Sequence, residues 1–289
     1  MTALGALEPR LPPLDRSDPV AEISTLTALP HWRAVDFISD LHLCEALPLT
    51  FEALVEHLAC TDADAVLILG DLFEVWVGDD QRHRPFEQAC VSALRAQAGQ
   101  RWLGFMVGNR DFLVGTDLCE AAGLHRLDDP TCLHAFGRRW LLTHGDALCL
   151  EDVEYQAFRR MVRGDDWQAQ FLRQPFEARW AVAGRIREES RSRKSVAADP
   201  SLWADVDPQA AQAWLAQAGA HTLIHGHTHR PGDESWGKGA ARSVLSDWDL
   251  DHLHPRAHVL RLDASGLSRR EPASRSGKPR NASPIAGLA

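Results

Sequence analysis

The sequence lacks the features that would place the protein outside a reducing aqueous compartment. Its six cysteines are scattered over 289 residues, and no two of them form a CxxC pair. The first residues, which include Glu8 and Arg10, contain no apolar segment like the core of a secretory signal peptide. No apolar stretch is long enough to cross a bilayer. We therefore expect reduced thiols, a cytoplasmic location, and at most a peripheral contact with a membrane.

The chain also lacks an excess of positive charge. It has 31 Lys and Arg against 40 Asp and Glu, which gives a formal net charge of -9. Because binding to a phosphate backbone needs a positive field, nucleic acid is not an expected partner. What the chain does have is 45% hydrophobic residues, enough to bury a large core as one domain with insertions.

Five short apolar runs are each followed by Asp, Asn or His. The pattern is clearest at residues 66–69, where Gly70 and Asp71 follow directly. An apolar run containing Val and Ile is typical of a strand that is buried on both faces. The catalytic groups of open α/β sheets gather at the carboxyl ends of such strands. The other runs end at Asp40 and His42, at Asn109, at His144, and at His227 and His229.

The segments between these runs favour helices, so the sequence predicts an α/β fold for residues 33–266. Apolar residues recur at helical spacing over several stretches, which are 47–59, 86–98, 116–122 and 207–217. Residues 125–136 are expected to be a strand pair or an extended connection. Closing strands are expected at 244–248 and 258–262. Residues 1–32 are predicted to be an irregular extension with at most a short helix over 20–26, and residues 267–289 to be disordered.

Residues 151–196 interrupt the alternation of strands and helices. They have no strand signal, and six Lys and Arg between 179 and 194 are interleaved with apolar residues such as Phe171, Trp180 and Ile186. One interpretation is a solvated helical pair whose charges are partly balanced by Glu188 and Glu189. The other is a helical cap, inserted at about 151–200, that presents cations and apolar surface to a ligand.

The polar residues at the strand ends form a set suited to divalent metal ions. Asp40 and His42 are two residues apart, as are His227 and His229, and in extended backbone such side chains share a face. Nitrogen and oxygen ligands without a thiolate suit Mn²⁺, Mg²⁺, Fe²⁺ or Zn²⁺. The set is too large for one catalytic ion with an open position, so we predict two ions that share a carboxylate. The predicted metal ligands are Asp40, His42, Asp71, Asn109, His144, His227 and His229.

Arg110 directly follows one of these ligands, in the order Gly-Asn-Arg-Asp. A His at this position could help to protonate an alkoxide leaving group. Arg cannot act as a general acid, because its pKa lies above about 12. It can bind a phosphate with two parallel hydrogen bonds. Arg110 therefore points to cleavage of a pyrophosphate, in which the leaving phosphate needs no proton.

The ordered motifs resemble those of the calcineurin-like metallophosphoesterase superfamily. They are Asp40-x-His42, Gly70-Asp71, Gly108-Asn109, His144 and Gly226-His227-x-His229. The resemblance implies an αββα sandwich with a dinuclear centre. It further implies that Asp71 bridges two ions, one held by Asp40, His42 and His229 and the other by Asn109, His144 and His227.

A closer resemblance runs from about residue 35 to about residue 262. Residues 40–43, 70–80, 108–113, 144–149, 155–159 and 225–231 are similar to motifs of the UDP-2,3-diacylglucosamine hydrolase family of lipid A biosynthesis. Members of that family hydrolyse the pyrophosphate of UDP-2,3-diacylglucosamine to UMP and 2,3-diacylglucosamine 1-phosphate, called lipid X. They prefer Mn²⁺, are peripheral on the cytoplasmic face of the inner membrane, and house the acyl chains in a helical cap.

The family resemblance also implies roles for individual residues. Asp71, Asn109, Arg110 and His227 are expected to act in catalysis, and the last three to contact the substrate phosphates. Asp152, Ser190 and Lys194 are expected to bind the nucleotide or glucosamine part. The segment after Ser190 is shorter than is usual in the family, so Arg191 or Arg193 could take the role of Lys194.

Two alternatives remain at this level. The first is a soluble phosphodiesterase or nucleotide pyrophosphatase of the same fold, which would not need the apolar residues of the cap. The second is a non-enzymatic scaffold built on the same fold. The complete set of ligands argues against the scaffold, because a scaffold has no need to retain them.

Overall fold

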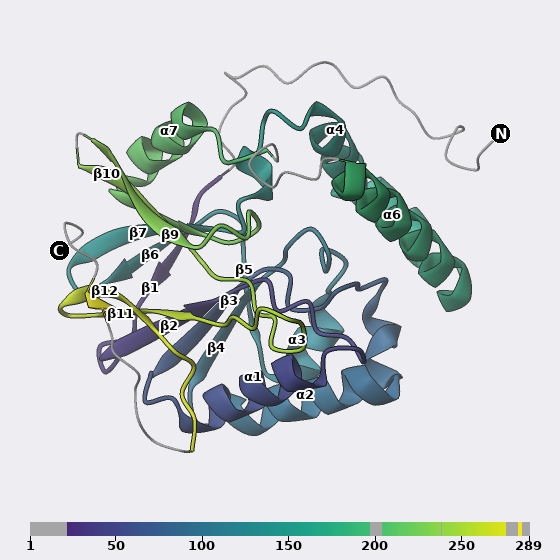
Figure 1. The fold of residues 1–289 in the computed structure, drawn as a ribbon, viewed down its shortest axis with the longest axis horizontal. Coiled ribbons are helices and arrows are strands. Elements are labelled where there is room, and N and C mark those ends of the chain that lie inside the picture. Colours follow the sequence, from purple (N-terminus) through teal and green to yellow (C-terminus); the bar gives the residue numbers. More distant parts are fainter. Residues whose placement is uncertain (1–21, 197–203, 238, 276–282, 285–289) are drawn as a thin grey trace.

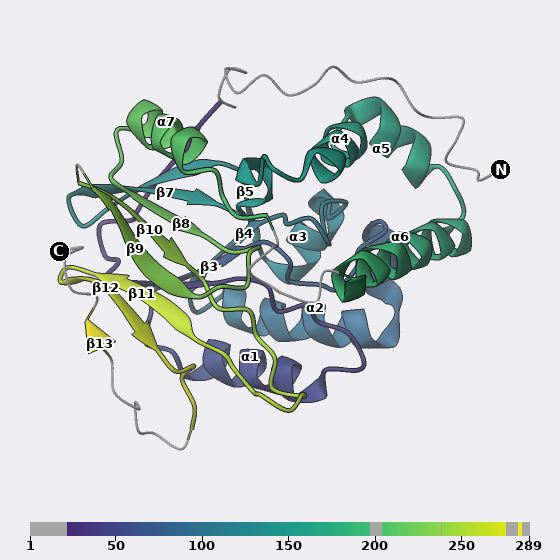
Figure 2. The same cartoon turned by 45° about the horizontal axis from the view of Figure 1, so that its top comes forward.

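The computed structural model describes residues 22–196, 204–237, 239–275 and 283–284. Two sheets pack face to face, and helices cover the outer face of each (Figures 1 and 2). A group of three helices lies to one side of the strand ends. This arrangement confirms the predicted αββα sandwich with an inserted helical cap.

The first sheet has seven strands in the order β13-β12-β11-β2-β3-β4-β5. Strands β2 to β5 are parallel, and β11 to β13 add antiparallel strands beside β2. The strands are β2 (Ala34–Ile38), β3 (Ala65–Leu69), β4 (Trp102–Met106), β5 (His125–Leu127), β11 (Val259–Asp263), β12 (Gly266–Arg270) and β13 (Ser283–Pro284). The outer face carries α1 (Pro48–Cys60), α2 (Pro85–Ala98) and α3 (Thr116–Ala122), as the helical spacing predicts.

The second sheet has six strands in the order β1-β6-β7-β8-β10-β9. Helix α7 (Pro208–Ala218) covers its outer face, and the side chain of Asp207 caps that helix by accepting from two backbone N–H groups. The strands are β1 (Ser24–Thr27), β6 (Thr131–Ala135), β7 (Arg138–Thr143), β8 (Thr222–His225), β9 (Gly232–Gly237) and β10 (Ala240–Val244).

Strand β3 shows why the central strands are apolar throughout. Val66 and Ile68 face the helices, whereas Leu67 and Leu69 face the second sheet, and all four are fully buried. Successive side chains of a strand point to opposite faces, and here both faces are covered. Each fully buried side chain of this kind contributes about 1.5–3 kcal/mol. Those contributions hold the strand ends, and the loops that follow them, in place.

The cap consists of three helices that follow β7 in the chain. They are α4 (Val153–Val162), α5 (Asp165–Leu172) and α6 (Phe176–Val196). Phe171 is 6% exposed and belongs to the core cluster between the first sheet and its helices. Phe176 and Trp180 are partly buried against that cluster. The apolar residues of the cap are therefore not simply a solvated surface, because several of them anchor the cap to the sandwich. In the described part of the chain, no helix combines the length and apolar character needed to span a membrane.

The predictions for the N-terminal residues and for one closing strand were wrong. Residues 24–27 form β1, which pairs in parallel with β6 and is neither irregular nor helical. Thr25 and Thr27 are exposed while Ser24 and Leu26 are half-buried, the alternation of an edge strand with one covered face. Strand β10 ends at Val244, where a strand over 244–248 was predicted to begin.

The prediction of a disordered tail after Gly266 was also wrong for the described residues. Gly266 has φ 113°, which lets the chain turn from β11 into β12. Leu267 is 5% exposed in the core between the sheets, and Arg269 forms an ion pair with Asp233 at 2.8 Å. The tail therefore begins as a packed hairpin strand, and β13 adds a second short strand beside it.

Candidate metal centre

The seven predicted ligands meet at the carboxyl ends of five strands. Three strands of the first sheet and two of the second supply them, so the group lies where both sheets end. In chain order, β2 is followed by Asp40 and His42, β3 by Asp71, β4 by Asn109, β7 by His144, and β8 by His227 and His229. His42 and His229, which are 187 positions apart in the sequence, thus become neighbours.

One group of ligand atoms comes from Asp40, His42 and His229. The Nε2 atoms of the two imidazoles are 3.3 Å apart. Nε2 of His229 also lies 3.3 Å from Oδ1 of Asp40. Single ligand atoms of these three residues all lie within 4.8 Å of one another, a spacing that one metal ion can join.

A second group surrounds Asn109. Its Oδ1 lies 3.0 Å from Nε2 of His144 and 2.8 Å from Nδ1 of His227. Nε2 of His144 is 3.7 Å from Oδ1 of Asp71, and Asp40, Asp71 and His144 again have ligand atoms within 4.8 Å of one another. Asp40 is therefore common to both groups. The bridging role of Asp71 stays a prediction.

The backbone at the site is strained in a way that the sequence does not reveal. Asp40, His42, Asp71, His227 and His229 all have φ between 49° and 65°, in the left-handed region. Residues with a side chain rarely adopt this region, and each instance costs on the order of 1–3 kcal/mol. Asp40 and His42 converge on one group of ligand atoms, whereas His227 and His229 belong to different groups. Both pairs have this left-handed backbone and not the extended backbone that we predicted. Strain of this kind accumulates where function requires it.

Glycine precedes three of the ligands because a side chain would collide with the site. A Cβ at Gly108 would lie 2.1 Å from Oδ1 of Asp71, and a Cβ at Gly70 would lie 2.4 Å from Nδ1 of His144. Gly70 also has φ 92°, which is the turn predicted at the end of β3. The glycines of the motifs therefore allow the ligand side chains of neighbouring strands to pack directly against the backbone.

Three imidazoles have an oxygen acceptor near Nδ1, and for His144 the contact is a hydrogen bond. Nδ1 of His42 lies 3.2 Å from Oε2 of Glu74, and Nδ1 of His229 lies 3.5 Å from Oδ2 of Asp247. Nδ1 of His144 is 2.9 Å from the carbonyl oxygen of Leu69. A proton on Nδ1 suits these contacts and leaves the lone pair of each Nε2 directed into the site, as in metal-binding histidines oriented by a carboxylate or carbonyl.

The lone pairs that converge in this way repel one another unless a cation lies between them. Nε2 of His42 faces Nε2 of His229, and Nε2 of His144 faces the oxygens of Asn109 and Asp71. This arrangement of buried acceptors fits a divalent cation, since nitrogen and oxygen donors are the ligands that Mn²⁺, Mg²⁺, Fe²⁺ and Zn²⁺ accept.

The electrostatic field at the site favours positive charge. Burial by itself would lower the pKa of His144, but the carboxylates of Asp71, Asp40 and Asp146 outweigh burial and raise that pKa to about 9. Burial opposes charge on His42 as well, and Glu74, Asp71 and Asp40 still raise its pKa. Metal ions bind neutral imidazole, so this field favours any cation that replaces the protons.

Arg110 and Asp111 connect the loops after β3 and β4. The backbone N–H of Arg110 donates to Oδ1 of Asp71 at 2.8 Å. The buried carboxylate of Asp111 accepts from the backbone N–H groups of Gly108 and Leu72, both at 2.7 Å. Within the described residues, the guanidinium of Arg110 forms no hydrogen bond or ion pair of its own. It therefore has its donors available for a ligand.

Sequence reasoning missed the residues that join the cap to the site. Buried Asp146 accepts from the hydroxyl of Tyr155 at 2.5 Å and from Nε of Arg159 at 2.9 Å. The ring of Tyr155 stacks on His227 with centroids 6.0 Å apart. The motifs contain all three residues, but their partners are visible only in the fold. Helix α4 is in this way fixed beside the ligand His227.

The predicted substrate-binding residues outside the metal cluster lie on the cap. Exposed Asp152 caps α4, accepting from the backbone N–H of Tyr155 at 3.0 Å. That position is one turn from the ring on His227, and its carboxylate has an exposed face. Ser190 and Lys194 belong to α6, as do Arg191 and Arg193, but their side chains lie outside the described residues.

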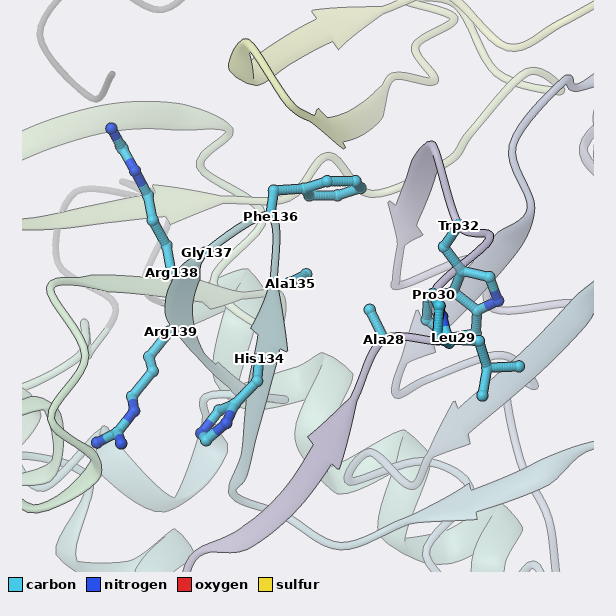
Figure 3. A pocket seen from close by; sticks show the side chains of 10 residues that line it. All are labelled: Ala28, Leu29, Pro30, Trp32, His134, Ala135, Phe136, Gly137, Arg138 and Arg139. Carbon is cyan, nitrogen blue, oxygen red and sulfur yellow. The ribbon is translucent and has the colours of Figure 1, made fainter.

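A pocket of about 470 Å³ lies elsewhere, between the segment after β1 and the β6–β7 hairpin. Figure 3 shows Trp32 on one side of it and Phe136 and His134 on the hairpin side. None of the seven predicted ligands lines this pocket. The pocket and the ligand cluster are therefore separate features.

Comparison with known proteins agrees with the fold. Residues 34–231 match the family model of the calcineurin-like phosphoesterases. The chain belongs to the calcineurin-like phosphoesterase family, and within it to the group of UDP-2,3-diacylglucosamine hydrolases. The match spans all five strands that carry the predicted ligands.

The relatives that define this group align over most of the chain. The UDP-2,3-diacylglucosamine hydrolase of Bordetella pertussis is 42% identical over 246 residues, which cover 82% of this chain and 93% of the relative. The enzyme of the same name from Stenotrophomonas maltophilia is 42% identical over 243 residues, 80% of this chain and 96% of the relative. Among solved structures, Vacuolar Protein Sorting 29 from Cryptosporidium parvum aligns with 15% identity and a TM-score of 0.44, covering 87% of this chain and 96% of that one.

Proposed function

We propose that this protein is a metal-dependent pyrophosphohydrolase that cleaves UDP-2,3-diacylglucosamine to UMP and 2,3-diacylglucosamine 1-phosphate. The observation that carries the proposal is the cluster of seven nitrogen and oxygen ligands, in which Asp40, Asp71 and His144 are buried and the Nε2 atoms of His42 and His229 face each other. The choice of substrate is supported by relatives of that name at 42% identity. The two supports are independent, since one is geometric and the other comes from sequence similarity.

The proposed cofactors are two Mn²⁺ ions. Asp40, His42 and His229 would hold one, Asn109, His144 and His227 the other, and Asp71 would join them. Bound there, the ions supply an activated water and take up charge on the phosphoryl oxygens. Two ligand groups that share Asp40 support the count of two, and the absence of a thiolate among the ligands supports a hard or borderline ion.

The side chains of the protein then orient the pyrophosphate. Arg110 is held by its backbone N–H against Asp71, so its unpaired guanidinium starts at the edge of the cluster. There it can bind two phosphate oxygens in parallel and stabilise the charge that develops on the leaving phosphate. Asn109 and His227, which already touch each other, would contact the same phosphates. No side chain has to protonate the leaving group, because phosphate leaves as an anion.

The proposed location is the cytoplasmic face of the inner membrane, with a peripheral contact. Its support is the diacylated substrate and the cap, whose Arg187 pairs with Glu74 beside the ligand His42. Flotation with vesicles of phosphatidylethanolamine and phosphatidylglycerol tests it directly. We expect a fraction of the protein to float, and a protein that stays entirely at the bottom at low salt would contradict the proposal.

Product analysis in water labelled with ¹⁸O tests the reaction. The enzyme, freed of metal with a chelator and then given Mn²⁺, should convert UDP-2,3-diacylglucosamine to UMP carrying one ¹⁸O. Label in UMP shows attack on the α-phosphorus, whereas label in the sugar phosphate would contradict the mechanism. Activity should vanish with the chelator and return with Mn²⁺. Equal turnover of UDP-glucosamine without acyl chains would favour the alternative of a soluble nucleotide pyrophosphatase.

A further inference from the structure

Two side chains connect the cap helix α6 to the candidate ligand His42. Arg187 of α6 donates from Nη2 to Oε1 of Glu74 at 2.7 Å. The other oxygen of this carboxylate, Oε2, lies 3.2 Å from Nδ1 of His42. The side chains of Arg187, Glu74 and His42 are 26%, 15% and 16% exposed, so solvent screens these contacts only in part. Glu74 thus contacts the cap with one oxygen and the ligand with the other.

Two other arginines of the cap make contacts that end differently. Arg163 of the cap donates to the carbonyl oxygen of Gly108 at 2.9 Å. Arg179 of α6 donates to the carbonyl oxygen of Val77 and to the carboxylate of Asp80. These contacts attach the cap to loops. The contact through Glu74 ends on an imidazole nitrogen of a candidate ligand, so it can transmit the state of that ligand to α6.

We propose that Glu74 and Arg187 are positioning residues that couple the binding of a divalent cation at His42 to the docking of α6. A cation bound by His42 would fix the orientation of its imidazole and therefore the position of Nδ1 beside Glu74. The position of the Glu74 carboxylate would in turn favour its hydrogen bond with Arg187. Coupling between two binding events is reciprocal, so a docked α6 also strengthens binding of the cation. The inference rests on the proposed metal site, and it does not depend on the identity of the substrate.

The sign of one measurement separates this coupling from a simple charge effect. Arg187 carries a positive charge, which by itself repels a cation in the cluster. Removing that charge would therefore tighten cation binding if Arg187 acted only through space. If Arg187 acts by holding Glu74 against His42, removing it should weaken binding instead. Changes to groups that orient metal ligands typically cost 10–100-fold in metal affinity.

The test is titration of the metal-free full chain with Mn²⁺, following the free ion by electron paramagnetic resonance. We expect Arg187→Met to weaken the binding of Mn²⁺ about tenfold. Arg187→Lys keeps a donor and a charge, so it should recover most of the affinity. The matched control is Arg185→Met on the same helix, where an exposed arginine forms no ion pair within the described residues, and it should bind like the wild type. Unchanged or tighter binding by Arg187→Met would overturn the proposal.

Hydrogen exchange supplies a second readout that does not require activity. Mn²⁺ should slow amide exchange across residues 176–188 in the wild type and in Arg185→Met, but not in Arg187→Met or Glu74→Gln. Equal slowing in all four proteins would overturn the coupling while leaving the metal site intact. A wild type that binds no Mn²⁺ at all would overturn the metal site and the proposed function with it. Melting temperatures of the apo proteins show whether each variant is folded.

Discussion

Strand β2 carries two buried carboxylates that lie in opposite kinds of surroundings. Asp36, in the strand, accepts from Nε and Nη2 of Arg261 at 2.6 and 2.9 Å and from the hydroxyl of Thr61 at 2.6 Å. Nε2 of His57 lies 3.5 Å from it. Asp40, just beyond the strand, belongs instead to the cluster of facing acceptors. Both carboxylates are fully buried, so burial and charge alone do not tell them apart.

The difference lies in the kind of partner that the protein supplies. A guanidinium meets Asp36, whereas Asp40 accepts from the hydroxyl of Ser39 and from the backbone N–H of His227. Around Asp36 both carboxylate oxygens are matched by donors, and the backbone keeps the regular conformation of a strand. Around Asp40 lone pairs converge and five residues adopt a left-handed backbone. A buried polar cluster that completes its own contacts supports the fold, whereas one left without a counter-ion and held under strain is arranged for something that binds.

We call the group around Asp36 the closed cluster and the group of predicted ligands around Asp40 the open cluster. The largest expected effect comes from a substitution in the open cluster. Asp71→Ala should reduce kcat by roughly 10³-fold or more, because it removes a ligand that belongs to the metal centre. The apo protein should remain folded, because Asp71 follows β3 and lies outside the apolar core clusters of the sandwich. Steady-state kinetics in Mn²⁺-replete buffer and calorimetry measure the two. Retention of a substantial part of wild-type kcat would contradict the assignment.

Breaking the closed cluster should have the reverse outcome. Asp36→Ala leaves the guanidinium of Arg261 buried without its main partner, which should cost about 3–5 kcal/mol of unfolding free energy. The kcat of the protein that remains folded should stay near the wild-type value. Urea unfolding and assays at low temperature measure this. A stable but inactive Asp36→Ala protein would contradict the structural role that we assign to Asp36.

The closed cluster also gives a pH dependence. Burial lowers the pKa of His57 from 6.5 to about 4, with Asp36 opposing the shift. The unfolded chain therefore binds more protons than the folded protein between these values, so stability falls as the pH is lowered from 6.5 to 4. The loss from this residue amounts to about 3 kcal/mol. His57→Asn should remove that part of the slope in urea titrations, and an unchanged slope would show that His57 does not carry it.

The smallest effect concerns two apolar residues of the cap. Here too, we compare a residue that packs against the protein with one that could contact a ligand. Trp180 packs against the core cluster and lies under the guanidinium of Arg84 at 4.6 Å, so Trp180→Ala should mainly lower the melting temperature. Ile186 is half-buried and is not part of that cluster. If the cap binds acyl chains, Ile186→Ala should weaken binding of the diacylated substrate about tenfold and leave a deacylated analogue unaffected. Equal losses on both would assign Ile186 to packing.

The ligands can be predicted from the sequence because both their position after a strand and their chemistry are recognisable. A buried strand is recognisable from its apolar run, and a residue such as Asp71 or His144 at its end has an unambiguous metal chemistry. The helices of the sandwich are predicted for a similar reason, since their apolar residues recur at one spacing. Strands β1 and β12 were missed because short strands with a half-covered face have only a weak alternation.

The residues that orient the ligands could not be predicted. Glu74 and Asp247 belong to segments that the fold alone brings to His42 and His229, and a carboxylate gives no local sign of which imidazole it will meet. The ion pair between Arg187 and Glu74 spans 113 residues. The left-handed backbone of Asp40 and His42 was likewise hidden, because the spacing of two residues suggested an extended chain. Such features arise from packing between elements, which a single sequence does not specify.

The most direct test of this account is the anomalous difference density of a crystal grown with Mn²⁺ and measured above the manganese absorption edge. We expect strong density among Asp40, His42 and His229, and a second maximum beside Asp71, Asn109, His144 and His227, with none near Asp36. Density at other residues, or no density at the cluster when Mn²⁺ is in excess, would contradict the assignment of this site as the metal centre.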